Sequence, residues 1–302
     1  MALKITPPSE PIATSTLIIT LFGQPGIGKS TLAFSAPKPL LLDFDGGAQR
    51  AAGRKDTVRV HSWADVADIA QADVAAYDTI ILDTVGRALE YLAADLMKGN
   101  PKLGRSTGEL SMQGYGALKT AFAQWLGRIR TFGKHVILIA HEKEEKDGDN
   151  TIVRVDAMGA TRIEVIRLSD LVGFVSAVNG KRLLDFNPTD KHTGKNCAGF
   201  DALTIADVKL DPEWMAGVMR EALTRMNAVT EEQREREAEL AHWREVIGNI
   251  ATADQVNAAI PGLPPDQAVK AIFARHAKAL GLVWNGKAYQ AKTAVEQADA
   301  AA

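Results

Sequence analysis

The sequence predicts an α/β fold in which a mostly parallel sheet is covered by helices on both faces and carries a small C-terminal all-helical appendage. Short runs of continuous apolar residues, typical of strands buried on both faces, alternate with segments of helical periodicity. The first apolar run leads directly into the glycine-rich stretch GQPGIGKS, which cannot continue a strand. From about Asp211 only helical patterns remain. We therefore expect a flexible leader over residues 1–14, a core over 15–210, and a helical appendage over 211–302 with a frayed C-terminus.

The core elements are expected as alternating strands and helices. Strands are predicted at Thr16–Phe22, Pro39–Asp43, Asp78–Asp83, His135–Ala140, Leu171–Val178 and Leu183–Phe186. Helices are predicted to begin at Thr31 and at the capping-box pair Ser62 and Asp65, and to span Val85–Met97 and Leu118–Phe132. Two polar stretches, residues 98–112 and 141–158, lack periodicity and are expected to be loops. In the appendage, Thr230 and Gln233 are predicted to cap a charged helix.

The composition excludes several classes of protein. The 302 residues carry a formal net charge of −2, so no whole-protein field attracts nucleic acid or anionic membranes. The single Cys197 excludes an internal disulfide framework and a thiolate metal cluster. The N-terminal stretch has no apolar segment of the signal-peptide kind, and no apolar run reaches membrane-spanning length. These features predict a cytoplasmic protein with no membrane partner.

The glycine-rich stretch matches the phosphate-binding pattern G-x-x-x-x-G-K-[ST], with a strand before it and a helix after it. Its glycines let successive backbone N–H groups point at one anion. Lys29 adds a positive charge for β- and γ-phosphate oxygens, and Ser30 offers a hydroxyl to Mg²⁺. An ordinary glycine-rich turn would not need the lysine, the hydroxyl and both flanks. We therefore expect ATP and Mg²⁺ to bind at Gly23, Gln24, Pro25, Gly26, Ile27, Gly28, Lys29, Ser30 and Thr31.

Two aspartates end predicted strands at the edge where parallel sheets bind their ligands. Asp83 is expected to hold Mg²⁺ together with Ser30, as a Walker B carboxylate does, although it could instead cap the next helix. The following residue is Thr84 and not glutamate, so the base that activates water must come from elsewhere. Asp45 is the leading candidate for that base, with a role in the Asp-Gly turn as the alternative. Asp43 is expected to be structural.

The order of these motifs resembles the RecA/RadA core, and most closely the short phage-encoded recombination ATPases of the Sak type. The sequence has a P-loop, the run LDFD over residues 42–45 and the run IILDTV over 80–85. A loop, a long helix, a strand ending Ile-Ala-His over 139–141 and a second loop complete the order. The resemblance covers residues 15–200 and implies a RecA-like P-loop NTPase fold with ATPase activity. The P-loop and Walker B motifs are shared by all P-loop ATPases, and it is the order and spacing of the other pieces that narrow the family.

The resemblance implies roles for two residues at strand ends. Asp45 stands where the family places its catalytic glutamate, and its side chain is one methylene shorter, which bears on the rate of hydrolysis and not on nucleotide binding. His141 stands where the family has a polar sensor of the γ-phosphate, usually glutamine. A hydrogen-bonded histidine with a structural role at the strand end is the alternative for His141.

The resemblance also implies two DNA-binding loops, Lys98–Gln113 and His141–Gly159. The cations that would contact phosphates of single-stranded DNA are Lys98, Lys102, Arg105, Lys143, Lys146 and Arg154. Solvated loops are rich in lysine in any case, carboxylates dilute the second loop, and the first contains no aromatic residue to stack on bases. The DNA assignment therefore depends on the resemblance more than on local charge.

Two lysines, Lys191 and Lys195, follow the last predicted core strand. By the resemblance, RecA-type ATPases supply lysines from this region to the nucleotide of the next subunit, where they stabilise charge on the transferred phosphoryl group. Lys181 and Arg182 form a second such pair. The implied assembly is a ring or a filament with nucleotide at the subunit junction.

Three functions are compatible with these sequence features. The leading interpretation is a single-stranded-DNA-stimulated recombination ATPase that promotes annealing or strand pairing as an oligomer, in the bacterial host cytoplasm if the chain is phage-encoded. A ring helicase or helicase-associated ATPase would use the same core. A nucleotide-gated DNA-binding or assembly module with slow turnover is the third, because Asp45 replaces a glutamate.

Other P-loop classes fit less well. A small-molecule kinase would need an arginine-rich lid, an ABC ATPase an LSGGQ-like signature, and an AAA+ protein an Asp-Glu pair where this chain has Asp83 and Thr84. The appendage has apolar helical faces but no residues at catalytic spacing. We therefore expect it to tune assembly or to recruit a partner such as a single-strand-binding protein.

Overall fold

The chain divides into two compact units, one over Thr14–Asn227 and the other over Met1–Ala13 with Ala228–Ala302. The computed structural model describes residues 3, 6, 12–148 and 150–291. Most of the predicted leader and all of residues 292–302, which include the frayed end predicted from the sequence, lie outside the described residues. The division between the units falls inside one long helix, α6 (Trp214–Gly248).

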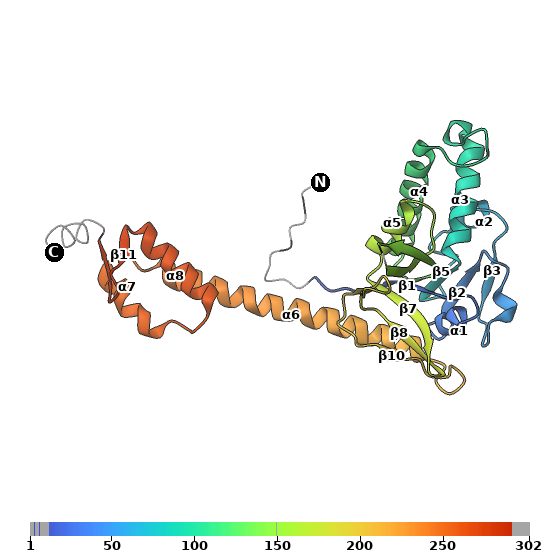
Figure 1. The fold of residues 1–302 in the computed structure, drawn as a ribbon. Coiled ribbons are helices and arrows are strands. Elements are labelled where there is room, and N and C mark those ends of the chain that lie inside the picture. Colours follow the sequence, from blue (N-terminus) through green and yellow to red (C-terminus); the bar gives the residue numbers. More distant parts are fainter. Residues whose placement is uncertain (1–2, 4–5, 7–11, 149, 292–302) are drawn as a thin grey trace. The chain divides into compact units, whose positions relative to one another are not determined.

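The Thr14–Asn227 unit is built on one ten-stranded sheet (Figure 1). Its strands are β1 (Ile18–Gly23), β2 (Pro39–Asp43), β3 (Thr57–Arg59), β4 (Thr79–Asp83), β5 (His135–Asp147), β6 (Asn150–Val155), β7 (Leu171–Val178), β8 (Lys181–Asp185), β9 (Lys195–Asn196) and β10 (Leu203–Thr204). The order is β10-β8-β7-β1-β5-β4-β2-β3, with β6 paired to β5 and β9 to β7. Neighbours from β7 to β3 in that order run parallel, and β6, β8, β9 and β10 pair antiparallel. The predicted mostly parallel sheet is confirmed.

The parallel strands bring the predicted site residues to one edge. Every residue of β1 is buried, as expected for a continuous apolar strand with neighbours on both sides. At the carboxyl ends Gly23 of β1 pairs with His141 of β5, and Asp43 of β2 pairs with Asp83 of β4. Four segments distant in sequence therefore end side by side.

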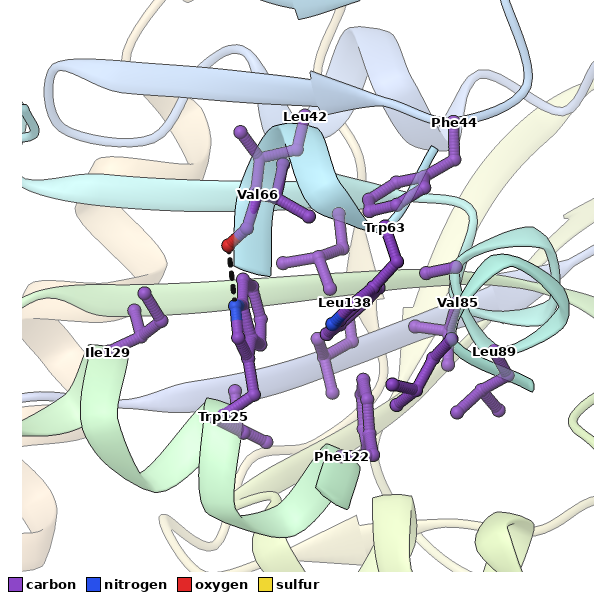
Figure 2. Close-up of a cluster of buried hydrophobic side chains, with 14 of the residues drawn as sticks. Leu42, Phe44, Trp63, Val66, Val85, Leu89, Phe122, Trp125, Ile129 and Leu138 are labelled. Carbon is purple, nitrogen blue, oxygen red and sulfur yellow. Dashed lines mark hydrogen bonds between the residues drawn. The ribbon is translucent and has the colours of Figure 1, made fainter. Parts of the chain in front are cut away.

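Helices cover both faces of the sheet, as the sequence predicts. They are α1 (Lys29–Ala33), α2 (Ala64–Ala67), α3 (Val85–Gly99), α4 (Met112–Thr131), α5 (Thr161–Leu168) and the first part of α6, with short 3-10 turns η1 (Ala48–Arg50) and η2 (Pro101–Leu103). One face packs an aromatic cluster beneath α2, α3 and α4, where the Trp125 indole N–H donates to the Val66 carbonyl at 2.8 Å (Figure 2). The other face packs Leu32 of α1 and Met215 and Met219 of α6 on the sheet.

The connections between elements include one tight turn and two departures from the predictions. Asn179 and Gly180 both adopt positive φ, 51° and 75°, in the two-residue turn between β7 and β8, as a tight hairpin requires. The predicted loop over 141–158 is instead largely a β-hairpin, because β5 continues past the sheet core to residue 147 and pairs with β6. The helix predicted to begin at Thr230 begins at Trp214, since no proline or glycine between residues 218 and 247 interrupts it.

The second unit contains the rest of α6, α7 (Ala253–Ala259), the turn η3 (Ile260–Gly262), α8 (Gln267–Ala279) and a hairpin of β11 (Leu282–Trp284) and β12 (Tyr289–Ala291). Its core gathers Ile247, Val256, Val269 and Phe273. The hairpin corrects the prediction of an all-helical appendage, and Asn285-Gly286 between short β-prone runs is a recognised turn signal.

Candidate functional site

The chain passes from β1 to α1 through residues 23–30, which form the P-loop. Gly26 and Gly28 have φ values of 79° and 96°, a region that residues with a Cβ rarely adopt. A Cβ on Gly28 would also lie 2.5 Å from a guanidinium nitrogen of Arg182, which packs against the loop from β8. These two glycines are therefore required by the backbone path of the loop.

Lys29 is buried beneath the P-loop, with 5% of its surface exposed. Its ammonium donates to the carbonyls of Gly23 at 2.7 Å and Gln24 at 2.8 Å. Burial lowers the pKa of Lys29 from 10.5 to about 8, against the opposing effect of the carboxylates of Asp83, Glu142 and Asp45. The ammonium of Lys29 is thus held by two carbonyls of its own loop, and phosphate oxygens could take the place of these acceptors.

Ser30 and Asp83 form the tightest polar contact of the site. The Ser30 hydroxyl donates to an Asp83 carboxylate oxygen at 2.5 Å. Burial raises the pKa of Asp83, and the hydrogen bond from Ser30 is the largest effect opposing the rise. Mg²⁺ prefers oxygen ligands and typically takes one or two carboxylates plus substrate phosphates, so this pair of oxygens fits the ion.

Asp45 and His141 face each other more loosely. The Thr84 hydroxyl donates to Asp45 Oδ1 at 3.3 Å, and His141 Nε2 lies 3.7 Å from Asp45 Oδ2. The two side chains are 28% and 40% exposed. His141 Nδ1 is buried and has no hydrogen-bond partner within the part of the chain that the structure describes. This pair could accept a water or a phosphate oxygen without breaking a strong contact.

One cavity of about 480 Å³ is lined by these residues. Its lining includes Pro25, Gly26, Gly28, Lys29, Ser30, Thr31, Asp45, Arg50, Asp83 and His141. The structure therefore brings the predicted phosphate-binding, metal-binding and base candidates together. Asp43 points elsewhere: its carboxylate accepts from the backbone N–H groups of Gly47 and Ala48 and fixes the turn after β2, as expected of a structural residue.

A smaller cavity, of about 160 Å³, adjoins the first one through Thr31. Phe34, Arg182 and Pro212 are among the residues that line it. The Arg182 guanidinium lies within reach of both the P-loop and the carbonyl of Ala206. Of the second pair of cations named from the sequence, Arg182 therefore contacts the P-loop of its own chain.

Sequence reasoning missed one carboxylate at this site. Glu142 counted only as a negative charge in a loop, yet its influence on the pKa of Lys29 ranks between those of Asp83 and Asp45. Its Oε2 atom is buried and has no hydrogen-bond partner among the described residues. No motif marks this position, and only the adjacency of Glu142 to His141 at the strand end could have signalled it.

The first predicted DNA-binding loop is folded and its cations are exposed. Lys98 lies in the last turn of α3 and Lys102 in η2, while Arg105 N–H donates to the Glu109 carbonyl at 2.7 Å. Lys98, Lys102 and Arg105 all have exposed side chains. The segment joins the ends of α3 and α4 that lie away from the sheet (Figure 1).

The cations of the second predicted loop lie on the hairpin of β5 and β6. Lys143 and Lys146 are exposed on β5. Arg154 on β6 forms an ion pair with Glu145 at 3.3 Å, and Glu145 also pairs with Arg162 at 2.5 Å. The two lysines are therefore the hairpin cations that are better placed to meet a ligand.

The two lysines assigned to a neighbouring nucleotide differ in their surroundings. Lys195 Nζ donates to the carbonyls of Ser169 at 2.5 Å and Arg167 at 3.1 Å, so these bonds would have to break before it could act across a subunit junction. Lys191 has an exposed side chain, and its carbonyl accepts from the N–H of Val153 at 2.8 Å. The segment that carries Lys191 is thereby joined to β6.

Comparison with known proteins gives a family and one relative. The profile of a family described as "AAA domain" matches residues 15–198. The SPbeta prophage-derived uncharacterized protein YorG of Bacillus subtilis (strain 168) is 28% identical over 192 residues, which are 59% of this chain and 57% of that protein. Among the described residues, no helix is long and apolar enough to cross a membrane.

Proposed function

We propose a function for this chain that starts from its family: it belongs to the AAA domain family of P-loop ATPases. The proposed function is that of a DNA-stimulated ATPase that promotes single-strand annealing or strand pairing as an oligomer. Its family generally uses ATP with Mg²⁺. Thr84 stands where an AAA+ protein would carry a glutamate after the Walker B aspartate, so we assign water activation to another residue.

The residues around the cavity suggest how ATP would be bound. Lys29 would exchange the carbonyls of Gly23 and Gln24 for β- and γ-phosphate oxygens. Ser30 and Asp83 would share Mg²⁺ in place of the hydrogen bond between them. When bound, the ion supplies charge stabilisation at the phosphates. Each change replaces a contact already present, so the loop need not be rebuilt.

Asp45 is the residue we assign to water activation. It lies at the cavity with His141, and among the described residues its carboxylate accepts one long hydrogen bond, from Thr84. A carboxylate so placed can orient the attacking water and accept its proton while His141 contacts the γ-phosphate. Catalytic hydrogen bonds are often long before substrate binds, so the loose geometry is compatible with this role.

The observation that carries the DNA part of the proposal is the continuity of β5. His141 lines the nucleotide cavity, and Lys143 and Lys146 follow it on the same strand. A displacement of His141 by the γ-phosphate would therefore shift cations that are suited to DNA phosphates. This link supports a DNA contact whose strength depends on the bound nucleotide.

Recombination, single-stranded DNA as substrate, and a ring or filament are supported by the RecA-like order of motifs. The prophage origin of the relative supports a phage-encoded protein acting in the host cytoplasm. The nucleotide-gated module with slow turnover is a second candidate, because Asp45 is short and only loosely held. A ring helicase is the remaining alternative.

The test is the rate of ATP hydrolysis by the full chain with and without single-stranded DNA, together with annealing of complementary oligonucleotides. We expect DNA to raise the hydrolysis rate, ATP to promote annealing, and particle images with a non-hydrolysable analogue to show closed rings or filaments. The Lys29→Ala variant is the control for contaminating ATPases. Hydrolysis that DNA leaves unchanged, without annealing, would reject the proposal. ATP-driven unwinding of a duplex would favour the helicase.

A further inference from the structure

The C-terminal unit contains a small module, residues 250–291, and none of its residues is among those that line the nucleotide cavity. Asn257 fixes its hairpin, donating to the Tyr289 carbonyl at 2.9 Å and accepting from the Tyr289 N–H at 2.7 Å. Thr252 and Gln255 form a complete capping box at the start of α7. Asp266 caps α8, accepting from two backbone N–H groups, and also pairs with Arg236. These contacts give the module a defined fold, which packs on the end of α6.

A groove of about 630 Å³ crosses this module. It is lined by Ile260, Leu263, Pro265, Lys270, Phe273, Ala274, Trp284 and Tyr289. Phe273 forms the buried end of a chain of three rings, with centroids 5.9 Å from Phe273 to Tyr289 and 5.2 Å from Tyr289 to Trp284. Trp284 at the open end is 46% exposed, a large apolar surface that is expensive to leave in water.

The segment that forms most of the groove carries only basic charged residues. Within the part of the chain that the structure describes, Lys270 is the only charged residue that lines the groove. The sequence from residue 267 to 291 contains Lys270, Arg275, Lys278 and Lys287 and not one aspartate or glutamate. The nearest preceding carboxylate, Asp266, is engaged by Arg236 and by the start of α8. An apolar groove with a lysine at its edge complements a ligand that is negatively charged and carries an apolar side chain.

We propose that this groove docks an acidic peptide segment of a partner protein, with an aromatic or large aliphatic side chain against Phe273 and Trp284 and a carboxylate on Lys270. Aromatic residues in such pockets commonly carry most of an interface's binding energy. The lining favours a peptide over single-stranded DNA, because apolar residues dominate it and one cation is too few to follow a phosphate backbone. The proposal is independent of the ATPase assignment.

The test is selection of a random octapeptide library on the immobilised full-length chain, followed by anisotropy measurements with the enriched peptides. We expect enrichment of acidic residues beside one aromatic or aliphatic residue. Lys270→Glu and Trp284→Ala should each weaken the affinity about tenfold or more, and Lys270→Arg should retain it. Arg275→Glu is the matched control, because it makes the same charge change on α8 at a residue outside the groove.

Each other outcome rejects the proposal in a recognisable way. Equal weakening by Arg275→Glu would mean general electrostatic attraction and no groove. Tight binding of a 20-nucleotide oligothymidine that Trp284→Ala abolishes would assign the surface to DNA. Peptide binding that appears only in a chain ending at Ala291 would mean that residues 292–302 occupy the groove themselves. A thermal melt of each variant identifies loss of folding, and the exposed Lys270 keeps the test decisive if Trp284→Ala unfolds.

Discussion

The two sides of the nucleotide cavity differ in how firmly their residues are held. On the binding side, Lys29 is buried and hydrogen-bonded twice, and Ser30 contacts Asp83 at 2.5 Å. On the hydrolysis side, Asp45 and His141 are separated by 3.7 Å and partly exposed to solvent. The comparison indicates that the residues of the binding side are already held in place in the free chain, whereas those of the hydrolysis side are held only loosely.

The largest effect is expected on the binding side. Lys29→Ala should weaken ATP binding by about 100-fold or more, because the P-loop loses the cation that faces the β- and γ-phosphates. Titration with a fluorescent ATP analogue measures the change, and Lys119→Ala, at an ion pair on α4, is the control. Retention of wild-type affinity by Lys29→Ala would reject the P-loop assignment.

The hydrolysis side should respond differently. Asp45→Asn is expected to bind ATP normally but to hydrolyse it about 100-fold more slowly, since the amide cannot accept a proton from water. Steady-state phosphate release and equilibrium binding separate the two effects. If Asp45→Asn hydrolyses at the normal rate while Glu142→Gln does not, Glu142 is the base and the cavity has a different active carboxylate.

The buried lysine should give the binding side a distinctive pH dependence. Phosphates favour the charged form of Lys29, whose pKa in the free chain is about 8, so ATP affinity should fall by up to about tenfold per pH unit above that value. The free chain should show the opposite trend. Between about pH 8 and 10.5 the unfolded state binds more protons at this residue, so this term raises the free energy of unfolding with pH.

Calorimetric titration of ATP at pH 8.5 in buffers of different ionisation enthalpy would detect the proton taken up by Lys29. Chemical denaturation over the same pH range gives the stability trend, with Lys29→Met as the control that removes the titrating group. Absence of proton uptake at pH 8.5 would show that Lys29 is already charged in the free chain.

A smaller effect is expected from the segment between α3 and α4. Removing Lys102 and Arg105 together should weaken single-stranded DNA binding and lower the slope of log affinity against log salt by about one to two. The Lys143→Ala, Lys146→Ala pair makes the same test on the β5–β6 hairpin. An unchanged slope in either double variant would mean that its segment makes no phosphate contact.

The smallest effect concerns stability. Burial raises the pKa of Asp83, so the ionised carboxylate disfavours the folded state at neutral pH, and this cost disappears as pH falls below the ordinary value of 3.8. Asp83→Asn keeps an acceptor for Ser30 and should raise the melting temperature of the free chain by about 2–4 °C. The same variant should lose the Mg²⁺ dependence of ATP binding. A lower melting temperature would show that the carboxylate stabilises the site.

The nucleotide site could be predicted from sequence because its residues lie in short motifs at the ends of strands. Ser30 and Asp83 are 53 positions apart and still meet, since parallel strands deliver their carboxyl ends to one edge. The order of the apolar runs was therefore enough to place them.

The parts that sequence reasoning missed depend on tertiary context. Residues 142–146 carry charges on both faces of β5, so no apolar alternation marked the strand, and its pairing with β6 decided the structure. Thr230 followed by Gln233 imitates a helix start, but a helix already in progress overrides a local cap signal. Glu142 Oε2 has no hydrogen-bond partner among the residues that the structure describes, which is a property of packing that the sequence does not reveal.

β5 runs without a break from the sheet core into the hairpin, and this continuity limits which insertions and deletions the strand can accept. Side chains alternate along a strand, so one residue gained or lost after His141 would transfer every following side chain of β5 to the opposite face. Inserting or deleting two residues would keep each side chain on its face. So would adding one residue to each strand near Gly148 at the hairpin tip. Natural variants and engineered insertions in this segment should therefore differ by even numbers of residues per strand, unless a bulge absorbs the odd one.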